Sequence, residues 1–166
     1  MDQEKILQVL NDPLGQELLQ TRSLARLAYN GQDGYPRVIP IGFYWNGAQI
    51  VVCTATNAPK VRALTRDPKV ALTIDTEAQQ PHVLLVRGIA QIEVVEGVPF
   101  EYLAASKKGI PEEQQQAFEA QVRSLYRQMA RIAITPQWAK LFDFETRIPD
   151  FLQELAAGRS DAQDQP

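Results

Sequence analysis

The sequence has very few of the residues on which most catalytic and metal centres depend. Its 166 residues include one cysteine, Cys53, and one histidine, His82. A single cysteine excludes an intrachain disulfide and a cysteine-based metal cluster, which fits a reducing cytoplasm. A single histidine excludes a site with two histidine ligands, and the chain lacks GxSxG, HExxH, Walker and GxGxxG sequences. We therefore expect no metal site, and neither the common hydrolase classes nor the metalloenzymes are supported.

The sequence also lacks an excess of positive charge and any long apolar run. With 17 Lys and Arg against 20 Asp and Glu, the net charge of −3 gives no general attraction to nucleic acid or an anionic membrane. The amino terminus, MDQEKILQVL, has acidic residues where a signal peptide needs basic ones, and no run approaches ~18 apolar residues. We expect a cytoplasmic protein that binds neither nucleic acid nor membrane. Residues 1–75 hold 8 basic and 7 acidic side chains against 9 and 13 in residues 76–166, so an anion site is expected in the first half.

The remaining composition, 45% apolar and 22% charged, is that of an ordinary globular protein. A chain of this length is about the size of one domain. Since we find no repeat or linker, we expect a single domain over residues 1–158 and a disordered polar tail over residues 159–166. A short helix before that tail is expected to end at Gly158.

Short helices are expected at the amino terminus and in one connection. Two of them fill the first twenty residues, with Asp12 as the N-cap and Pro13 at the first position of the second. Another begins after Asn57, its expected cap, and stops at Asp67, which precedes a proline.

Two further helices are expected in the second half, over residues 98–107 and 112–130. The apolar residues of the second repeat at four, three and four residues, which is typical of one helical face: Phe118, Val122, Leu125 and Met129. Such a face needs a surface to pack against.

Strands dominate the middle of the chain. We expect three antiparallel strands over residues 24–54, because Asn46-Gly47 between two apolar runs is the strongest short hairpin signal. Three more are KVALTID, HVLLVRGIAQIEVV and ARIAITPQWAKLFDFE, and Gly88 inside the second predicts a bulge or bend. No βαβ alternation recurs, so the expected class is α+β, mostly β, with a small antiparallel barrel of about six strands and peripheral helices.

Polar residues gather between the last strand of this first group and the helix that follows it. A phosphate is bound by backbone N–H groups at a helix start together with hydroxyl and basic side chains. Thr54, Thr56, Lys60 and Arg62 meet that description. Ordinary strand threonines and a solvated helical face would give the same pattern, so the spacing alone leaves both interpretations open.

The order of these segments resembles that of the pyridoxamine 5′-phosphate oxidase-like family, the FMN-binding split β-barrel flavoproteins. The resemblance extends from Leu24 to Phe144. It rests on the extended segment RVIPIG, the hairpin after it, Thr54 at a strand end, Lys60 six residues later, and the continuation KVRALTRDPKVALTID. It implies a split β-barrel and a homodimer with two cofactor sites at the interface, each built from both chains.

The resemblance also implies the residues of the cofactor site. Those beside the isoalloxazine ring would be Arg37, Val38, Ile39, Pro40 and Ile41, and those around the ribityl phosphate would be Cys53, Thr54, Pro59 and Lys60. The late segment ITPQWAKLFDF is similar to the one that reaches the partner's flavin, which nominates Trp138 and Lys140.

Two departures from the family pattern bear on the substrate. The glutamine that family oxidases carry five residues before the mid-strand glycine would fall on Val83, so that polar contact is missing or rearranged. The carboxy-terminal Arg-x-His element of true pyridoxine phosphate oxidases has no counterpart in this sequence. We therefore expect an oxidoreductase that is not a vitamin B6 oxidase.

The resemblance implies FMN as the cofactor, with the deazaflavin F420 as the alternative, and hydride transfer through N5 to or from a small conjugated or quinone-like substrate. The protein would supply binding, orientation and electrostatics, including a polar group near N1 for which Arg37 is the candidate. A substrate proton could come from solvent, Tyr29, Tyr44 or His82, and the sequence does not choose among them. Cys53 is expected to be a small buried residue and not a nucleophile. A cofactor-free or haem-binding split barrel remains the alternative outside enzymes.

Overall fold

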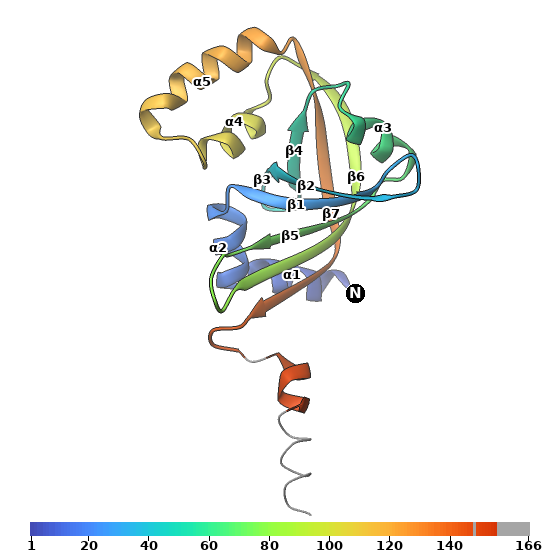
Figure 1. Cartoon of the computed structure of the whole chain (residues 1–166), viewed down its shortest axis with the longest axis vertical. Coiled ribbons are helices and arrows are strands. Elements are labelled where there is room, and N and C mark those ends of the chain that lie inside the picture. Colours follow the sequence, from blue (N-terminus) through green and yellow to red (C-terminus); the bar gives the residue numbers. More distant parts are fainter. Residues whose placement is uncertain (148, 156–166) are drawn as a thin grey trace, which may run out of the picture.

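The structure is a computed structural model that describes residues 1–147 and 149–155. In chain order the elements are α1 (Gln3–Asn11), α2 (Pro13–Thr21), β1 (Leu24–Asn30), β2 (Pro36–Gly42), β3 (Tyr44–Trp45), β4 (Ile50–Thr54), α3 (Pro59–Arg66), β5 (Lys69–Asp75), β6 (His82–Glu96), α4 (Phe100–Lys107), α5 (Glu112–Leu125) and β7 (Gln128–Asp143). Figure 1 shows a strongly curved sheet with α1 and α2 at its lower side, α4 and α5 at its upper left and α3 at its upper right. The predicted class, α+β and mostly β, is confirmed.

All strand pairs of the sheet are antiparallel, and the strand order is β2-β1-β5-β6-β7-β4-β3. The sheet does not close, so β2 and β3 are its two edges, as a split barrel requires. It has seven strands where about six were expected. The prediction of three strands over residues 24–54 was wrong, because RVIPIGFYW is interrupted at Phe43. That side chain is fully buried, and the chain then forms the short strand β3 and its hairpin with β4.

The longest ladder joins β6 to β7, and the bulge expected at Gly88 is confirmed. The register shifts between Arg87 and Gly88, which pair with Trp138 and Pro136. A Cβ atom added at Gly88 would lie 2.6 Å from the carbonyl oxygen of Thr135. Only glycine fits at this close approach, and the extra residue on β7 bends both strands around the core.

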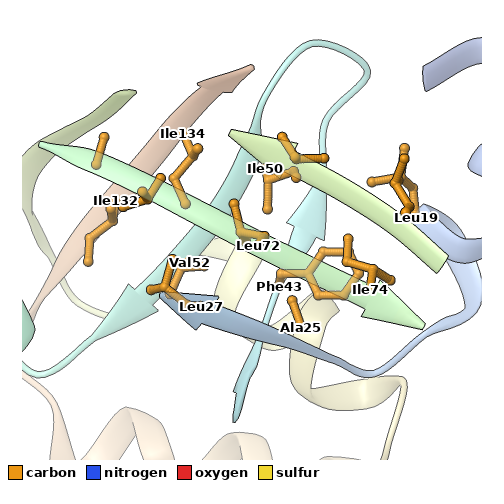
Figure 2. Packing of buried hydrophobic residues seen from close by; sticks show 14 of the residues in the cluster. Leu19, Ala25, Leu27, Phe43, Ile50, Val52, Leu72, Ile74, Ile132 and Ile134 are labelled. Atoms are coloured by element: carbon orange, nitrogen blue, oxygen red, sulfur yellow. The ribbon is translucent and has the colours of Figure 1, made fainter. Parts of the chain in front are cut away.

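The core lies inside the curve of the sheet. Figure 2 shows labelled side chains of β1, β4, β5, β7 and α2 that meet there with Phe43, among them Leu19, Leu27, Leu72 and Ile134. A second, smaller cluster packs α4 and α5 against the other face of β4 and β7: Val51, Cys53, Val98, Leu103, Val122 and Met129. The upper helices are thus attached through a core of their own.

The two amino-terminal helices are present, and the start predicted for the second is confirmed. Asp12 caps α2 by accepting a hydrogen bond from the backbone N–H of Leu14 at 3.0 Å, and Pro13 is the first helical residue. Asn57 is not the cap of α3, contrary to the prediction; the N-cap is Ala58, which makes no side-chain capping bond.

The prediction of a helix over residues 112–130 was also wrong. Helix α5 ends at Leu125, because Tyr126 takes an extended backbone conformation and Met129 already belongs to β7. Leu125 is 67% exposed, whereas Met129 is fully buried. The apolar residues that suggested one helix therefore belong to two elements: Phe118, Val122 and Leu125 lie in α5, and Met129 lies in β7.

The carboxy-terminal predictions are only partly covered by the described residues. Residues 150–155 are helical. Gly158 and residues 159–166, for which we predicted a helix end and a disordered tail, lie outside the described residues. Within the part that is described, no helix has the length and apolar character needed to cross a membrane.

Candidate functional site

A cavity of about 630 Å³ lies between the edge strand β2, the end of β4, the start of α3 and the helices α4 and α5. Its volume is within the range of small-molecule sites, ~300 to 1,000 Å³. The residues that line it come from both halves of the chain: Ser23, Leu24, Ile39, Pro40, Ile41, Gly42, Cys53, Thr54, Lys60, Tyr102, Ala105, Ser106, Gly109, Ile110 and Phe118. Six of the eleven predicted site residues are among them, namely Ile39, Pro40, Ile41, Cys53, Thr54 and Lys60.

One end of the cavity is basic. Thr54 ends β4, and Lys60 lies in the first turn of α3, which begins with Pro59. The Lys60 ammonium donates a hydrogen bond to Thr54 Oγ1 at 3.3 Å. Burial lowers the pKa of Lys60, and no carboxylate among the described residues compensates for that burial. A half-buried ammonium beside a hydroxyl and a helix start is a donor set for an anionic ligand.

Strand β2 lines the cavity with Ile39, Pro40, Ile41 and Gly42, and its backbone groups alternate between two directions. Because Gly31 N–H donates to the carbonyl of Tyr35, the odd-numbered residues of this hairpin direct their backbone groups toward β1. Even-numbered residues therefore direct their backbone N–H and carbonyl groups away from β1, and two of these residues, Pro36 and Pro40, have no N–H group. Val38 keeps the one outward N–H between these prolines, at the edge of the sheet.

Arg37, Val38 and Pro59, also predicted site residues, do not line the main cavity. Arg37 and Pro59 line a smaller neighbouring hollow of about 290 Å³ together with Tyr29 and Arg62. Arg37 is ion-paired with Asp33 at 2.5 Å, and the Val38 side chain is 65% exposed. The two hollows adjoin, because Arg37 and Ile39 are on one face of β2 and Pro59 precedes Lys60.

Trp138 and Lys140 lie on β7 beyond the bulge, away from the cavity within this chain. They line a separate hollow with residues of α1. The Arg87 guanidinium lies 4.3 Å from the centre of the Trp138 ring, and Lys140 Nζ lies 4.9 Å from that of Phe142. The structure of one chain thus does not bring these two residues to the other predicted site residues.

The three side chains nominated as proton donors also lie elsewhere. Tyr29 lines the smaller hollow, and Tyr44 packs edge-on against Phe100 with 5.4 Å between ring centres. His82 Nε2 lies 3.2 Å from Glu145 and 3.4 Å from Asp143. None of the three lines the main cavity.

Cys53 lines the cavity as expected of a small buried residue. Burial, followed by the nearby carboxylate of Glu101, raises the pKa of the thiol to about 12. The thiol is therefore protonated at neutral pH and is not a nucleophile. Glu101 also forms an ion pair with Arg131 on β7 at 2.9 Å, which ties α4 to the sheet.

The wall supplied by α4 and α5 was not anticipated from the sequence. Tyr102 and Ser106, four residues apart on α4, face the cavity with Phe118 of α5. The four-residue spacing of Tyr102 and Ser106 indicates that they share one face of α4. The spacing does not indicate which surface of the sheet this face covers.

Lys108, which directly follows α4, has a structural role. Its ammonium donates to the carbonyl oxygens of Leu19, Phe43 and Arg22 at 3.1, 3.3 and 3.4 Å. It also lies 4.3 Å from the centre of the Phe43 ring. This side chain joins the end of α4 to α2 and to the start of β3.

The cavity fits a ligand that combines a flat apolar body with a phosphate. Its volume and its wall of Ile39, Pro40 and Ile41 suit the body, and Lys60 and Thr54 suit the phosphate. FMN and F420 both have this combination, so the residues present fit the cofactors implied by the resemblance.

Comparisons with known proteins agree with this fold. Solved structures with the same fold include an F420 reductase, 25% identical with a TM-score of 0.57, which is matched over 75% of this chain and 94% of its own. The haem storage protein HutZ from Vibrio cholerae is 19% identical with a TM-score of 0.56, over 80% and 93%. An FAD-binding protein from Mesorhizobium loti is 15% identical with a TM-score of 0.50, over 76% and 87%. The last two show a shared fold and no more.

A search of curated protein sequences finds no match. The family model described as pyridoxamine 5′-phosphate oxidase, however, matches residues 12–145 and so includes every strand of the sheet and the whole cavity. The chain belongs to the pyridoxamine 5′-phosphate oxidase family.

Proposed function

We propose that this protein binds FMN in the main cavity and is an oxidoreductase that transfers hydride to or from a small conjugated or quinone-like substrate. The observation that carries the proposal is the half-buried Lys60 ammonium, which no carboxylate among the described residues neutralises, at one end of an apolar cavity. An uncompensated buried cation is costly unless an anionic ligand completes it.

In this proposal Lys60 and Thr54 hold the phosphate, and Ile39, Pro40 and Ile41 lie along the ring. The outward N–H of Val38 is the candidate donor to the ring edge. When bound, the cofactor supplies the hydride chemistry at N5. The chain's own residues bind it, orient it and exclude water from its apolar side.

We further propose that the protein is a homodimer with the cofactor at the interface. Trp138 and Lys140 lie away from the cavity of their own chain, so they could contribute to a site only across such an interface. Apolar side chains are also exposed at this edge of the sheet, namely Val38 on β2 at 65% and Leu24 on β1 at 53%. Exposed apolar patches of this kind are typical of subunit contacts.

F420 is the second candidate cofactor, because the F420 reductase is the neighbour described above with 25% identity over most of its own length. Haem is less well supported. The one histidine, His82, is held by two carboxylates outside the cavity, and the cavity thiol, Cys53, is protonated at neutral pH.

The test is a titration of the purified protein with riboflavin, FMN, F420 and haemin, followed by absorption and fluorescence. We expect the protein to retain a cofactor and be yellow as purified. If it is colourless, or once its cofactor has been removed, we expect it to bind added FMN or F420. We also expect FMN to bind more tightly than riboflavin, since only FMN has the phosphate. Colourless protein that binds neither FMN nor F420 would contradict the proposed function.

A further inference from the structure

The cavity has a second wall, formed by α4 and α5, that the phosphate and ring contacts proposed above do not use. It contributes Tyr102, Ala105, Ser106, Ile110 and Phe118. Because the cofactor is assigned to β2, β4 and the start of α3, this helical wall is the one that a substrate in the same cavity would meet.

The ring of Tyr102 is held in a fixed position on this wall. It stacks on Phe118 with 6.3 Å between ring centres and 17° between planes. On another side it meets Tyr126 edge-on at 6.2 Å and 65°. Such pairs are the preferred geometries of aromatic side chains, so the ring of Tyr102 has a defined place in the cavity lining.

The Tyr102 hydroxyl also has the right protonation state for a donor. Burial raises its pKa, and the neighbouring Tyr126 and Cys53 raise it further; together they outweigh the lowering of this pKa by the Ser106 hydroxyl. The hydroxyl is therefore fully protonated at neutral pH, and it can donate a hydrogen bond to an oxygen on which negative charge develops.

The other polar side chains of the cavity are less suited to this role. Ser106 Oγ already donates to the backbone carbonyl of Tyr102 at 2.8 Å. Lys60 and Thr54 are hydrogen-bonded to each other at the end of the cavity assigned to the phosphate. Burial and Glu101 raise the pKa of the Cys53 thiol to about 12. Ser23 is an aliphatic alcohol, which is a much weaker acid than a phenol.

We propose that Tyr102 is the residue that binds the substrate oxygen and protonates it, an assignment that rests on the proposed function. The substrate class is then a conjugated carbonyl compound small enough to lie between Phe118 and the cofactor. Hydride from the reduced cofactor forms a C–H bond at the far carbon of the double bond. The C=C π pair moves into the bond next to the carbonyl carbon, and the C=O π pair moves to the oxygen, which takes the proton as the Tyr102 O–H bond breaks and so gives an enol. Water returns a proton to the phenolate, and the enol rearranges to the saturated carbonyl compound, so the substrate gains two hydrogens in all.

The experiment compares Tyr102→Phe with Tyr126→Phe, a matched control that removes a hydroxyl from the same aromatic group without altering the cavity lining. Each variant is loaded with cofactor, and its cofactor affinity is measured first. The loaded protein is reduced with dithionite and mixed anaerobically with 2-cyclohexenone, and reoxidation is followed by absorption. In a separate binding assay, oxidised loaded protein is titrated with 4-nitrophenolate, an unreactive oxyanion with a visible absorption band.

For Tyr102→Phe we expect unchanged cofactor affinity, reoxidation at least ~100-fold slower, and 4-nitrophenolate binding weaker by about tenfold or more. Tyr126→Phe should stay within about twofold of the wild type in all three measurements. If Tyr102→Phe binds cofactor normally and matches the control in reoxidation and phenolate binding, the assignment of Tyr102 is wrong and the proposed function stands. If neither the wild-type protein nor either variant binds cofactor, the proposed function is wrong, and the assignment of Tyr102 is wrong with it.

Discussion

Replacement of Lys60 by alanine should weaken FMN binding and leave riboflavin binding unchanged. The Lys60 ammonium is half-buried beside Thr54, and no carboxylate among the described residues neutralises it. Its loss would remove the charge-assisted hydrogen bond that we propose to the phosphate, and such a bond is worth about 1.5 to 3 kcal/mol. This corresponds to a dissociation constant larger by about 10- to 150-fold.

The assay is quenching of flavin fluorescence, measured for FMN and riboflavin at low and high salt. Lys69→Ala is the matched control, because Lys69 is an exposed lysine on β5 that does not line the cavity. We expect the control to bind both ligands as the wild type does. The advantage of FMN over riboflavin should fall with salt in the wild type and be small at any salt in Lys60→Ala.

The dependence on pH gives a second check of the same residue. In the protein without ligand, burial lowers the pKa of Lys60 below 10.5, the usual value of lysine, so the ammonium loses its proton at a lower pH than an exposed lysine would. The preference for FMN over riboflavin should therefore decline as the pH rises toward the pKa of Lys60. If Lys60→Ala weakens riboflavin as much as FMN, Lys60 does not bind the phosphate and the orientation proposed for the cofactor is wrong.

Three further predictions concern stability and reactivity. Lys108→Met should destabilise the protein by about 2 kcal/mol in urea unfolding, because three backbone carbonyls lose their donor, whereas Lys107→Met, which loses one ion pair with Glu119, should cost under about 1 kcal/mol. Gly88→Ala should cost about 1 to 3 kcal/mol in the same assay, since its Cβ would lie 2.6 Å from a backbone oxygen; a cost near zero would contradict the close approach. Cys53 should resist a thiol reagent at pH 8 in the native protein and react on unfolding; rapid native labelling would contradict its burial and its pKa of about 12.

The sequence predicted those parts of the fold that local chemistry decides. The cap at Asp12, the Asn46-Gly47 hairpin and the bulge at Gly88 each depend on a backbone requirement that few residues can meet. The end of α5 was missed for the opposite reason. Apolar spacing from Phe118 to Met129 is compatible with one helix, and only the burial of Met129 in β7 decides that the helix stops earlier.

In the candidate site, too, the sequence predicted what depends on short-range structure and missed what depends on long-range packing. Residues joined by short stretches of chain, such as Thr54 and Lys60, could be expected to lie together, and they line one cavity. Tyr102 could not be placed, because its position depends on how α4 packs across β4, which is a long-range contact. For the same reason the sequence nominated Tyr29, Tyr44 and His82 as proton donors, and none of them lines the cavity.

The two walls of the cavity are held by different interactions, and this separation bears on how the site could vary. The wall of β2 is continuous with the main core, against which Ile39 and Ile41 pack, so most changes there would disturb the sheet itself. The wall of α4 and α5 rests on its own small cluster, on the Glu101–Arg131 ion pair and on Lys108. Side chains that face the cavity from that wall, Ile110 and Phe118 among them, can therefore change in size with little effect on the barrel. Substrate choice should depend on these helical positions, and cofactor affinity on the strand and helix-start positions opposite them.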